Sequence, residues 1–282
     1  MKIPKPIQIS VEEHINAKIN ATLSVSGGDI NQSARLHTEA GVFFLKWNES
    51  APNDMFKTEA RGLNLLASAE SGLVIPETIL VGDNFLLMEN IEEENSGNSY
   101  LFGSKLAIIH KKSNELFGLD HSNFIGRLPQ SNSFYANWLD FFVRERIEPQ
   151  VKMAINSGKM SSSLLAIFDR IMNFTYVQFP EEPPALLHGD LWNGNYMWTK
   201  EGNAAIYDPA VSFGHREMDI AMTRLFGGFD RLFYDGYNDI YPLEDGVEER
   251  IKLCNLYPVL IHANLFGGGY IDQATRLLKQ FF

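Results

Sequence analysis

The sequence predicts an α+β protein with two lobes, a small N-terminal lobe around an antiparallel sheet and a larger helical C-terminal lobe. Up to about residue 90, short strand-like stretches alternate with turns that contain glycine, which is typical of antiparallel sheets. The stretch 90–99, NIEEENSGNS, is polar and acidic, and beyond it the hydrophobic patterns are mostly helical. We therefore expect an N-terminal lobe over 1–90, a linker over 91–99 and a C-terminal lobe over 100–282.

The elements of the N-terminal lobe follow from local signals. Ser10 and Glu13 have the spacing of a capping box, which predicts a helix over about 11–20. A second helix is expected over 54–70, where apolar residues recur at helical spacing. Strands are expected at 21–26, 34–38, 42–47, 77–81 and 85–88.

The C-terminal lobe is expected to be helical with a small hairpin inside it. The pattern predicts helices over 100–116, 134–156 and 161–177, and then from about 217 to the end. The sequence Glu-Glu-Pro-Pro at 181–184 interrupts the helical pattern. Short strands are expected at 185–188, 196–199 and 204–207.

The composition argues against several classes of partner. Lys and Arg number 24 against 35 Asp and Glu, a net charge of −11, which repels nucleic acids and anionic membranes. Two prolines lie where a signal peptide would need its apolar core, and the uncharged stretch 253–271 carries Pro, Asn and three glycines, so no membrane helix is expected. Cys254 is the single cysteine. We expect a cytoplasmic protein.

The most informative segment is 187–209, LHGDLWNGNYMWTKEGNAAIYDP. Asp190 and Asn195 lie five residues apart in a glycine-containing loop, and Asp208 follows a predicted hairpin that Asn195 precedes. Asn195 and Asp208 should therefore be close in space, and their oxygens are ligands suited to Mg²⁺. Asp190 is placed to accept a proton from a hydroxyl. Kinases use the same parts, although Asp and Asn beside glycine also simply form turns.

The N-terminal lobe supplies an independent test of a kinase. A kinase needs a basic group on a strand for the ATP phosphates and a carboxylate on the next helix to orient it. Lys46 is the lysine of the strand at 42–47, and Glu59 follows on the predicted helix. Gly27 and Gly28 form a turn that could lay backbone N–H groups near phosphates, although such a pair is usually only a hairpin turn.

The sequence resembles the fructosamine kinase (ketosamine-3-kinase) family, in the aminoglycoside-phosphotransferase-like branch of the protein-kinase-like fold. The resemblance spans almost the whole chain, and its most specific part is HGDLWNGN together with DPAVSFGHREMDIAM. It is also carried by SGGDINQSARLHTEAGVFFLKWN, FGLDHSNFIGRLPQSNS and LIHANLFGGGY. It implies ATP-dependent phosphorylation of a sugar hydroxyl on a ketoamine, which is a glycated amine that is either a small molecule or part of a protein.

The resemblance implies a role for individual residues. Asp190 would be the catalytic base, Asn195 and Asp208 the Mg²⁺ ligands, and Lys46 the partner of Glu59. Met88 would be the gatekeeper, and the backbone of Glu89, Asn90 and Ile91 would contact adenine as the hinge. Some family members have a cysteine after the glycines of the nucleotide loop, which links two chains. This sequence has Asp29 there, so that redox link should be absent.

Two further residues, Trp192 and His262, are candidates on the acceptor side. Trp192 matches a tryptophan beside the family's catalytic loop, and both stacking on the acceptor sugar and simple packing fit an aromatic there. His262 is either an acceptor-binding residue or an ordinary core histidine. Asp219 is expected to brace the catalytic loop rather than to react.

Competing functions differ in the acceptor or in whether there is catalysis at all. A kinase of the same fold acting on an aminoglycoside, a choline-like compound or another hydroxyl metabolite is the nearest alternative. A nucleotide-binding pseudokinase usually lacks the base or a metal ligand, and this sequence has both. A protein kinase needs an activation segment, and nothing between Asp208 and Glu217 resembles one. The acceptor sugar and the oligomeric state are not encoded in any motif of the sequence.

Overall fold

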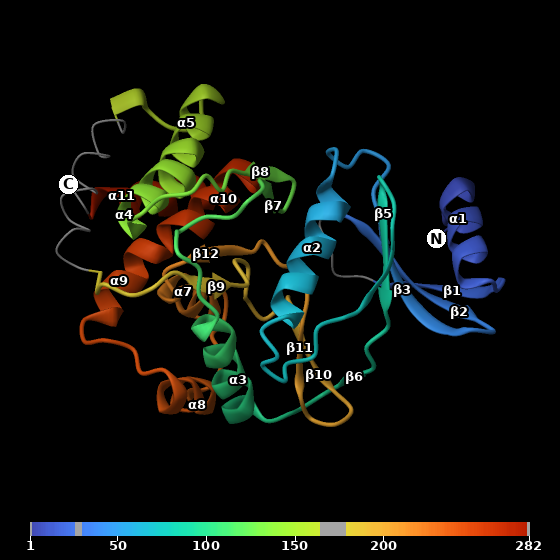
Figure 1. Cartoon of the computed structure of the whole chain (residues 1–282). Coiled ribbons are helices and arrows are strands. Elements are labelled where there is room, and N and C mark those ends of the chain that lie inside the picture. Colours follow the sequence, from blue (N-terminus) through green and yellow to red (C-terminus); the bar gives the residue numbers. More distant parts are fainter. Residues whose placement is uncertain (1, 26–29, 164–178, 281–282) are drawn as a thin grey trace. The chain divides into compact units, whose positions relative to one another are not determined.

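The computed structural model describes residues 2–25, 30–163 and 179–280. It divides into two compact units, one of Met1–Asn98 with Gly194–Pro209 and the other of Ser99–Asn193 with Ala210–Phe282. The first unit is rich in strands and the second is mainly helical, which confirms the α+β class (Figure 1). The segment 194–209, expected in the helical lobe, groups with the first unit.

An antiparallel five-stranded sheet forms the centre of the first unit. Its strand order is β1-β2-β3-β5-β4, and every neighbouring pair is antiparallel. The strands are β1 (Ile19–Val25), β2 (Gln32–Thr38), β3 (Gly41–Trp47), β4 (Thr78–Val81) and β5 (Phe85–Glu89). β1 therefore begins inside the stretch for which a helix is expected.

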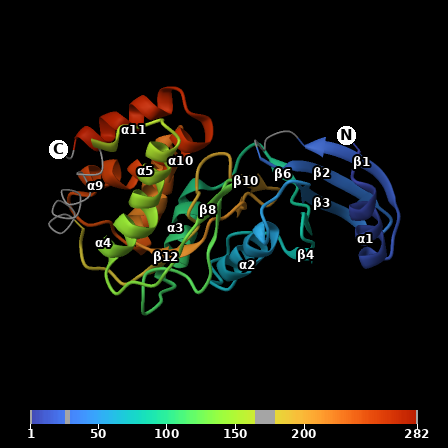
Figure 2. The same cartoon turned by 90° about the horizontal axis from the view of Figure 1, so that it is seen from above.

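Each face of this sheet is covered by one helix. Helix α1 (Lys5–Ile15) packs on the face that carries Leu45 and Trp47. Figure 2 shows this helix beside the strands of the sheet. Helix α2 (Met55–Ala67) packs on the other face, where Phe44 lies. Because side chains alternate along a strand, residue 46 of β3 belongs to the face that α2 covers.

The first helix is displaced from its expected position. It begins at Lys5 rather than near residue 11, because Pro4 and the proline that follows Lys5 lie in the first turn, where no backbone N–H has a helical partner. Ser10 and Glu13 consequently lie inside the helix and do not cap it. The helix ends at Ile15 and is followed by the C-cap residue Asn16, whose φ of 50° is left-handed.

Short strands complete both units. In the first unit, β6 (Glu93–Glu94), β10 (Tyr196–Thr199) and β11 (Ala204–Ile206) form a sheet in the order β11-β10-β6. The expected linker at 91–99 therefore contains a strand. The second unit has two small antiparallel pairs, β7 (Asn123–Ile125) with β8 (Leu128–Gln130), and β9 (Ala185–Leu187) with β12 (Ser212–Gly214).

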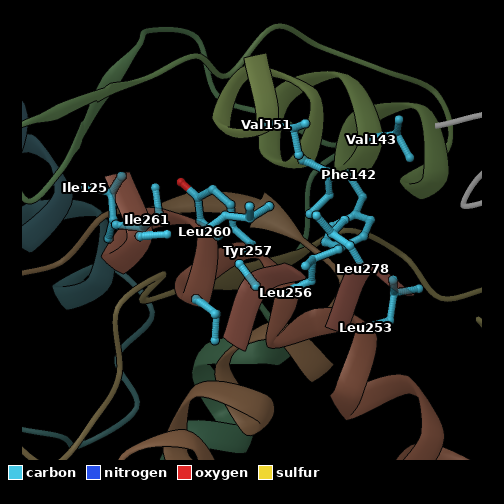
Figure 3. Packing of buried hydrophobic residues seen from close by; sticks show 14 of the residues in the cluster. Ile125, Phe142, Val143, Val151, Leu253, Leu256, Tyr257, Leu260, Ile261 and Leu278 are labelled. Atoms are coloured by element: carbon cyan, nitrogen blue, oxygen red, sulfur yellow. The ribbon is translucent and has the colours of Figure 1, made fainter. Parts of the chain in front are cut away.

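The second unit is built from helices around an apolar core. The expected helix over 134–156 begins at Trp138 and contains a π-helical turn, and the one over 161–177 lies mostly outside the described residues. Figure 3 shows Phe142 packed beside Leu256 and Leu278 in the core. The described helices are α3 (Ser99–Lys111), α4 (Trp138–Phe141), η1 (Phe142–Ile147), α5 (Glu148–Asn156), α7 (Glu217–Leu225), α8 (Arg231–Ile240), α9 (Val247–Cys254), α10 (Leu256–Phe266) and α11 (Gly269–Lys279).

The uncharged stretch at 253–271 is divided among three helices. Asn255 separates α9 from α10, and Gly267 and Gly268 separate α10 from α11. No helix in the part of the chain that the structure describes is long and apolar enough to cross a bilayer.

Helices α3 and α8 approach so closely that glycine is required at their contact. A Cβ atom on Gly103 would lie 1.8 Å from the carbonyl oxygen of Phe233, and one on Gly236 would lie 2.0 Å from that of Tyr100.

We expect Gly103→Ala to lower the free energy of unfolding by about 1–3 kcal/mol, because the helices must separate. Urea unfolding measures the loss. Gly269→Ala is the control, since a Cβ there meets nothing within 4 Å, and an equal loss in both variants would contradict the prediction.

Candidate active site

Lys46 joins two carboxylates that lie far apart in the sequence of the first unit. Its position on β3 directs it to the face that α2 covers, and Glu59 lies on that helix one turn from the buried residues Phe56 and Leu63. Lys46 Nζ is 2.7 Å from Glu59 Oε1 and 2.7 Å from Asp208 Oδ1. The structure thus brings these three predicted site residues together.

The charges around Lys46 keep it protonated. Burial by itself lowers the pKa of Lys46, but the carboxylates of Asp208 and Glu59 outweigh burial and raise the pKa above its ordinary value. The same burial raises the pKa of Glu59. Lys46 exposes 5% of its surface, whereas the Asp208 side chain is 40% exposed. Asp208 is therefore the accessible member of this cluster.

A hairpin brings Asn195 and Asp208 to the same end of the first unit's small sheet. Asn195 directly precedes β10 and Asp208 follows β11, and the two strands pair from Tyr196 opposite Ile206. The N–H of Tyr207 donates to the carbonyl oxygen of Asn195 over 3.1 Å. Asp208 has a left-handed φ of 58°. An amide and a carboxylate at one hairpin end are hard oxygen donors that fit Mg²⁺.

The structure describes some of the remaining nucleotide-side candidates but not all of them. Gly27 and Gly28 lie outside the described residues. Met88 is 2% exposed on β5, on the α2 side of the sheet. The N–H of Glu89 donates to the carbonyl oxygen of Glu77 over 2.9 Å, so the sheet already uses it.

The segment after β5 leaves a buried polar atom without a partner. The side-chain oxygen of Asn90 is buried and has no hydrogen-bond partner among the described residues. Ile91, next along the chain, is half-buried. Buried polar atoms are nearly always paired, so an orphan one is a reason to look for a ligand at this segment.

The loop that carries Asp190 is held by a buried aspartate in the second unit. Asp219, near the start of α7, accepts the backbone N–H of His188 at 2.7 Å and that of Gly189 at 2.9 Å. Gly189 has a φ of 83°, and a Cβ on it would lie 2.1 Å from the carbonyl oxygen of Ala210, so only glycine fits. The expectation that Asp219 braces this loop is confirmed.

The brace is itself fixed from α3 and α8. His110 Nε2 is 3.2 Å from the Asp219 carboxylate, and His110 Nδ1 is 2.7 Å from the hydroxyl of Tyr237. Burial raises the pKa of Asp219, but the hydrogen bonds from His110 and from the backbone outweigh burial and lower the pKa. Asp219 therefore stays ionised and keeps both loop N–H groups bound.

Asp190 lines a pocket that lies within the second unit. His262, one of the acceptor-side candidates, lines the same pocket. Trp192 does not, and its ring lies edge-on to Phe226 at 6.1 Å, while Phe226 lies 4.6 Å from the ring of His262. The polar residues of the wall are Gln130, Arg146, Asp190, Ser212, Tyr257 and His262.

Four of these wall residues were not candidates from the sequence, and one of them is Ser212 on β12. Gln130 lies on a short strand that no pattern indicates, and Arg146 lies on the π-helical turn. Tyr257 lies in an apolar helical stretch, where an aromatic residue is expected to be part of the core. Their shared pocket depends on contacts between distant elements, so the local hydrophobic pattern does not indicate it, although Gln130 lies within FGLDHSNFIGRLPQSNS, a segment that carries the family resemblance.

Phosphoryl transfer from ATP requires a cation for the phosphates, oxygen ligands for a metal ion and a carboxylate for the attacking hydroxyl, and side chains of these kinds occur among the candidates of the two units. The fold agrees with this requirement. The crystal structure of aminoglycoside phosphotransferase APH(4)-Ia resembles the chain with a TM-score of 0.62 over 97% of both chains, at 14% identity. The fold is therefore the one that kinase-like phosphotransferases adopt.

Sequence similarity identifies one family among the proteins that share this fold. The family model described as fructosamine kinase matches residues 4–282. A probable ketoamine kinase of Enterococcus faecium is 36% identical over 95% of this chain and 96% of its own length. The chloroplastic protein-ribulosamine 3-kinase of Arabidopsis thaliana is 35% identical over 92% of this chain and 81% of its own length. A crystal structure from Thermobifida fusca, of a protein assigned as a fructosamine-3-kinase, has a TM-score of 0.86 at 30% identity over 98% of both chains. The chain belongs to the fructosamine kinase family and is an ATP-dependent phosphotransferase.

Proposed function

We propose that the protein transfers the γ-phosphoryl group of ATP to the C3 hydroxyl of a ketosamine, the product of sugar addition to an amine. The observation that carries this proposal is the contact of Lys46 with both Glu59 and Asp208, because a kinase needs this lysine oriented towards phosphates. The relatives named as ketoamine and ribulosamine kinases support the acceptor class.

The first unit supplies the groups for the nucleotide. Lys46 is protonated, so it binds the phosphates of ATP when Asp208 releases it, while Glu59 holds its other side. The backbone of Glu89 and Ile91 binds the adenine ring below Met88. Only the carbonyl of Glu89 serves there, since its N–H is bound to Glu77.

Asn195 and Asp208 are the proposed ligands of Mg²⁺. Both lie at one end of the hairpin, and the Asp208 carboxylate is accessible. When bound, the ion offsets negative charge on the β- and γ-phosphates. Release of Asp208 from Lys46 then frees the lysine for the phosphates and the carboxylate for the metal.

Asp190 is the proposed base for the acceptor. A sugar hydroxyl is a weak acid, so its proton leaves as the new bond from oxygen to phosphorus forms. The proton passes to the Asp190 carboxylate, the bond between the γ-phosphorus and the bridging oxygen breaks, and ADP leaves with that electron pair. His262 binds the acceptor from the same pocket, and Trp192 offers its half-buried ring to the sugar.

The acceptor is a glycated amine, free or attached to a protein, and we place the reaction in the cytoplasm. A cationic acceptor suits a chain with a net charge of −11, and the buried Cys254 forms no disulfide. The oxidising compartments in which disulfides form are therefore not required for folding.

A coupled assay of ADP release tests the proposed function. The purified chain is given ATP, Mg²⁺ and a panel of free and protein-bound fructosamines, ribulosamines and aminoglycosides. We expect turnover with a fructosamine or ribulosamine and a product phosphorylated at C3, which ³¹P and ¹H NMR identify. Turnover with aminoglycosides alone would overturn the ketosamine assignment and keep the kinase.

A further inference from the structure

A buried chain of side-chain hydrogen bonds backs the pocket that Asp190 lines. It joins residues that each expose no more than 4% of their surface, namely Asn123, Gln130, Asn132, Arg146 and Tyr257. Arg146 Nη2 donates to Asn132 Oδ1 at 2.7 Å, and Asn132 Nδ2 donates to Asn123 Oδ1 at 2.8 Å. Gln130 Nε2 donates to the same Asn123 oxygen at 2.8 Å. The hydroxyl of Tyr257 donates to Gln130 Oε1 at 2.6 Å.

The direction of the last hydrogen bond is fixed by the others. Gln130 Nε2 also donates to the backbone carbonyl of Ala210 at 3.1 Å, so both contacts of its amide nitrogen are with oxygens. Its Oε1 is consequently the acceptor that faces Tyr257. A phenol has one hydrogen, and once Gln130 takes it, the Tyr257 oxygen has only lone pairs left to offer a ligand.

Two observations indicate that the Tyr257 hydroxyl oxygen faces the pocket. Tyr257 and Ile125 both line the pocket, and Figure 3 shows the Tyr257 hydroxyl oxygen directed toward the side of the core where Ile125 lies. Burial raises the pKa of Tyr257, Arg146 lowers it and Asp190 raises it, and the result is about 12. The hydroxyl therefore keeps its hydrogen at neutral pH and remains a donor to Gln130.

Arg146 holds the ring of Tyr257 from behind. Its guanidinium carbon lies 5.6 Å from the centre of that ring and 4.5 Å from the ring of Phe141. Its Nη1 donates to the carbonyl oxygens of Ser131 at 2.7 Å and Glu145 at 3.2 Å. Arg146 lies on the π-helical turn, a distortion that often occurs at functional sites. The ring is thus fixed on one side by a cation and at its tip by an amide.

His262, like Tyr257, presents a hydrogen-bond acceptor. Its Nδ1 lies 2.7 Å from the carbonyl oxygen of Pro258, which can only accept, so Nδ1 carries the hydrogen. Burial lowers the pKa of His262, which keeps the ring neutral at pH 7 and leaves Nε2 as an acceptor. Asp190, Tyr257 and His262 therefore all offer acceptors to a ligand in the pocket that they line.

We propose that Tyr257 is an acceptor-binding residue whose oxygen, oriented by Gln130, receives a hydrogen bond from a hydroxyl or ammonium group of the ketosamine. The proposal rests on the proposed function and adds a specificity-determining residue to it. The three acceptors of Asp190, Tyr257 and His262 suit a ligand rich in donors, and a ketosamine carries several hydroxyls and an amine. The same wall also holds one donor, the buried indole N–H of Trp138, which has no partner among the described residues.

Tyr257→Phe tests this role, because it removes the oxygen and keeps the ring. We expect the KM for the ketosamine to rise roughly 2- to 10-fold, the effect of one lost hydrogen bond, with the KM for ATP unchanged. Tyr135→Phe is the matched control. The Tyr135 hydroxyl donates to Glu145 at 2.9 Å in the same unit, and Tyr135 does not line the pocket, so its variant should keep both KM values.

The possible results separate the inference from the proposed function. An unchanged KM for the ketosamine in Tyr257→Phe, or the same rise in Tyr135→Phe, would overturn the role of Tyr257 while wild-type turnover upholds the proposed function. Absence of turnover by the wild type with every ketosamine overturns both.

Gln130→Met is a second variant, since it frees the Tyr257 hydroxyl to turn. A higher acceptor KM supports the inference, and an unchanged one opposes it.

Discussion

Asp190→Ala is expected to lower kcat by roughly 10²–10⁴-fold, the usual scale for a lost general base, while the affinity for ATP stays nearly constant. The reason is that Asp190 belongs to the second unit and lines the pocket that we propose binds the acceptor, whereas the proposed nucleotide groups belong to the first unit. Steady-state turnover gives kcat, and isothermal titration calorimetry gives ATP binding in the same preparation.

Lys46→Ala provides the contrast for this experiment. It removes the cation that we assign to the phosphates, so ATP use should weaken and added acceptor should not restore it. Asp190→Asn keeps the shape of the side chain and should fail like Asp190→Ala. An Asp190→Ala variant that binds ATP and retains more than about a tenth of the wild-type kcat would exclude Asp190 as a base worth at least 10²-fold.

Asp208→Asn is expected to remove most of the activity, by roughly 10²-fold or more, without unfolding the protein. The variant loses a carboxylate that we propose as a ligand of Mg²⁺, and the effect of such an ion on the transition state is worth several kcal/mol, at about 1.4 kcal/mol per tenfold in rate. The fold should persist because Lys46 keeps Glu59, so one cation and one carboxylate remain in the buried cluster. Activity measured against Mg²⁺ concentration, with a thermal unfolding curve, tests both parts.

Asp83→Asn is the matched control for the lost charge. Asp83 pairs with Lys57 at 2.9 Å on the exposed surface of the first unit, so its variant also removes one carboxylate from an ion pair. It should keep full activity. Turnover of Asp208→Asn near the wild-type value at saturating Mg²⁺ would show that Asp208 is not a metal ligand.

The parts of the site that depend on local spacing could be predicted from the sequence. Lys46 reaches Glu59 because a strand alternates its faces and a helix repeats every 3.6 residues, and both periods are visible in the chain. Asn195 and Asp208 lie together because a short hairpin joins them. The brace by Asp219 rested on a resemblance, and its hydrogen bonds bear it out.

The parts that depend on long-range packing could not be predicted. The hydrogen-bond direction at Tyr257 depends on Gln130, which is 127 residues away in the chain. Local patterns also misplaced the first helix, because the capping-box signal of Ser10 and Glu13 competes with a proline start that is compatible with a helix. The close approach of α3 and α8 could not be predicted either, because in a single sequence Gly103 and Gly236 look like ordinary residues that weaken a helix.

The strand-rich unit is discontinuous in the chain, and this limits how it can be exchanged between relatives. Residues 194–209 supply two of the three strands in its small sheet and receive the N–H of Asn98 at Gly202 over 3.0 Å. Val74 is likewise bonded on both sides to this hairpin, through Ala204 and Ile206, at 3.0 Å each. A chimera that exchanges residues 1–98 alone would build this small sheet from strands of two different parent proteins. A transplant of the lysine-bearing unit must therefore carry both segments, and the second of them ends one residue after Asp208.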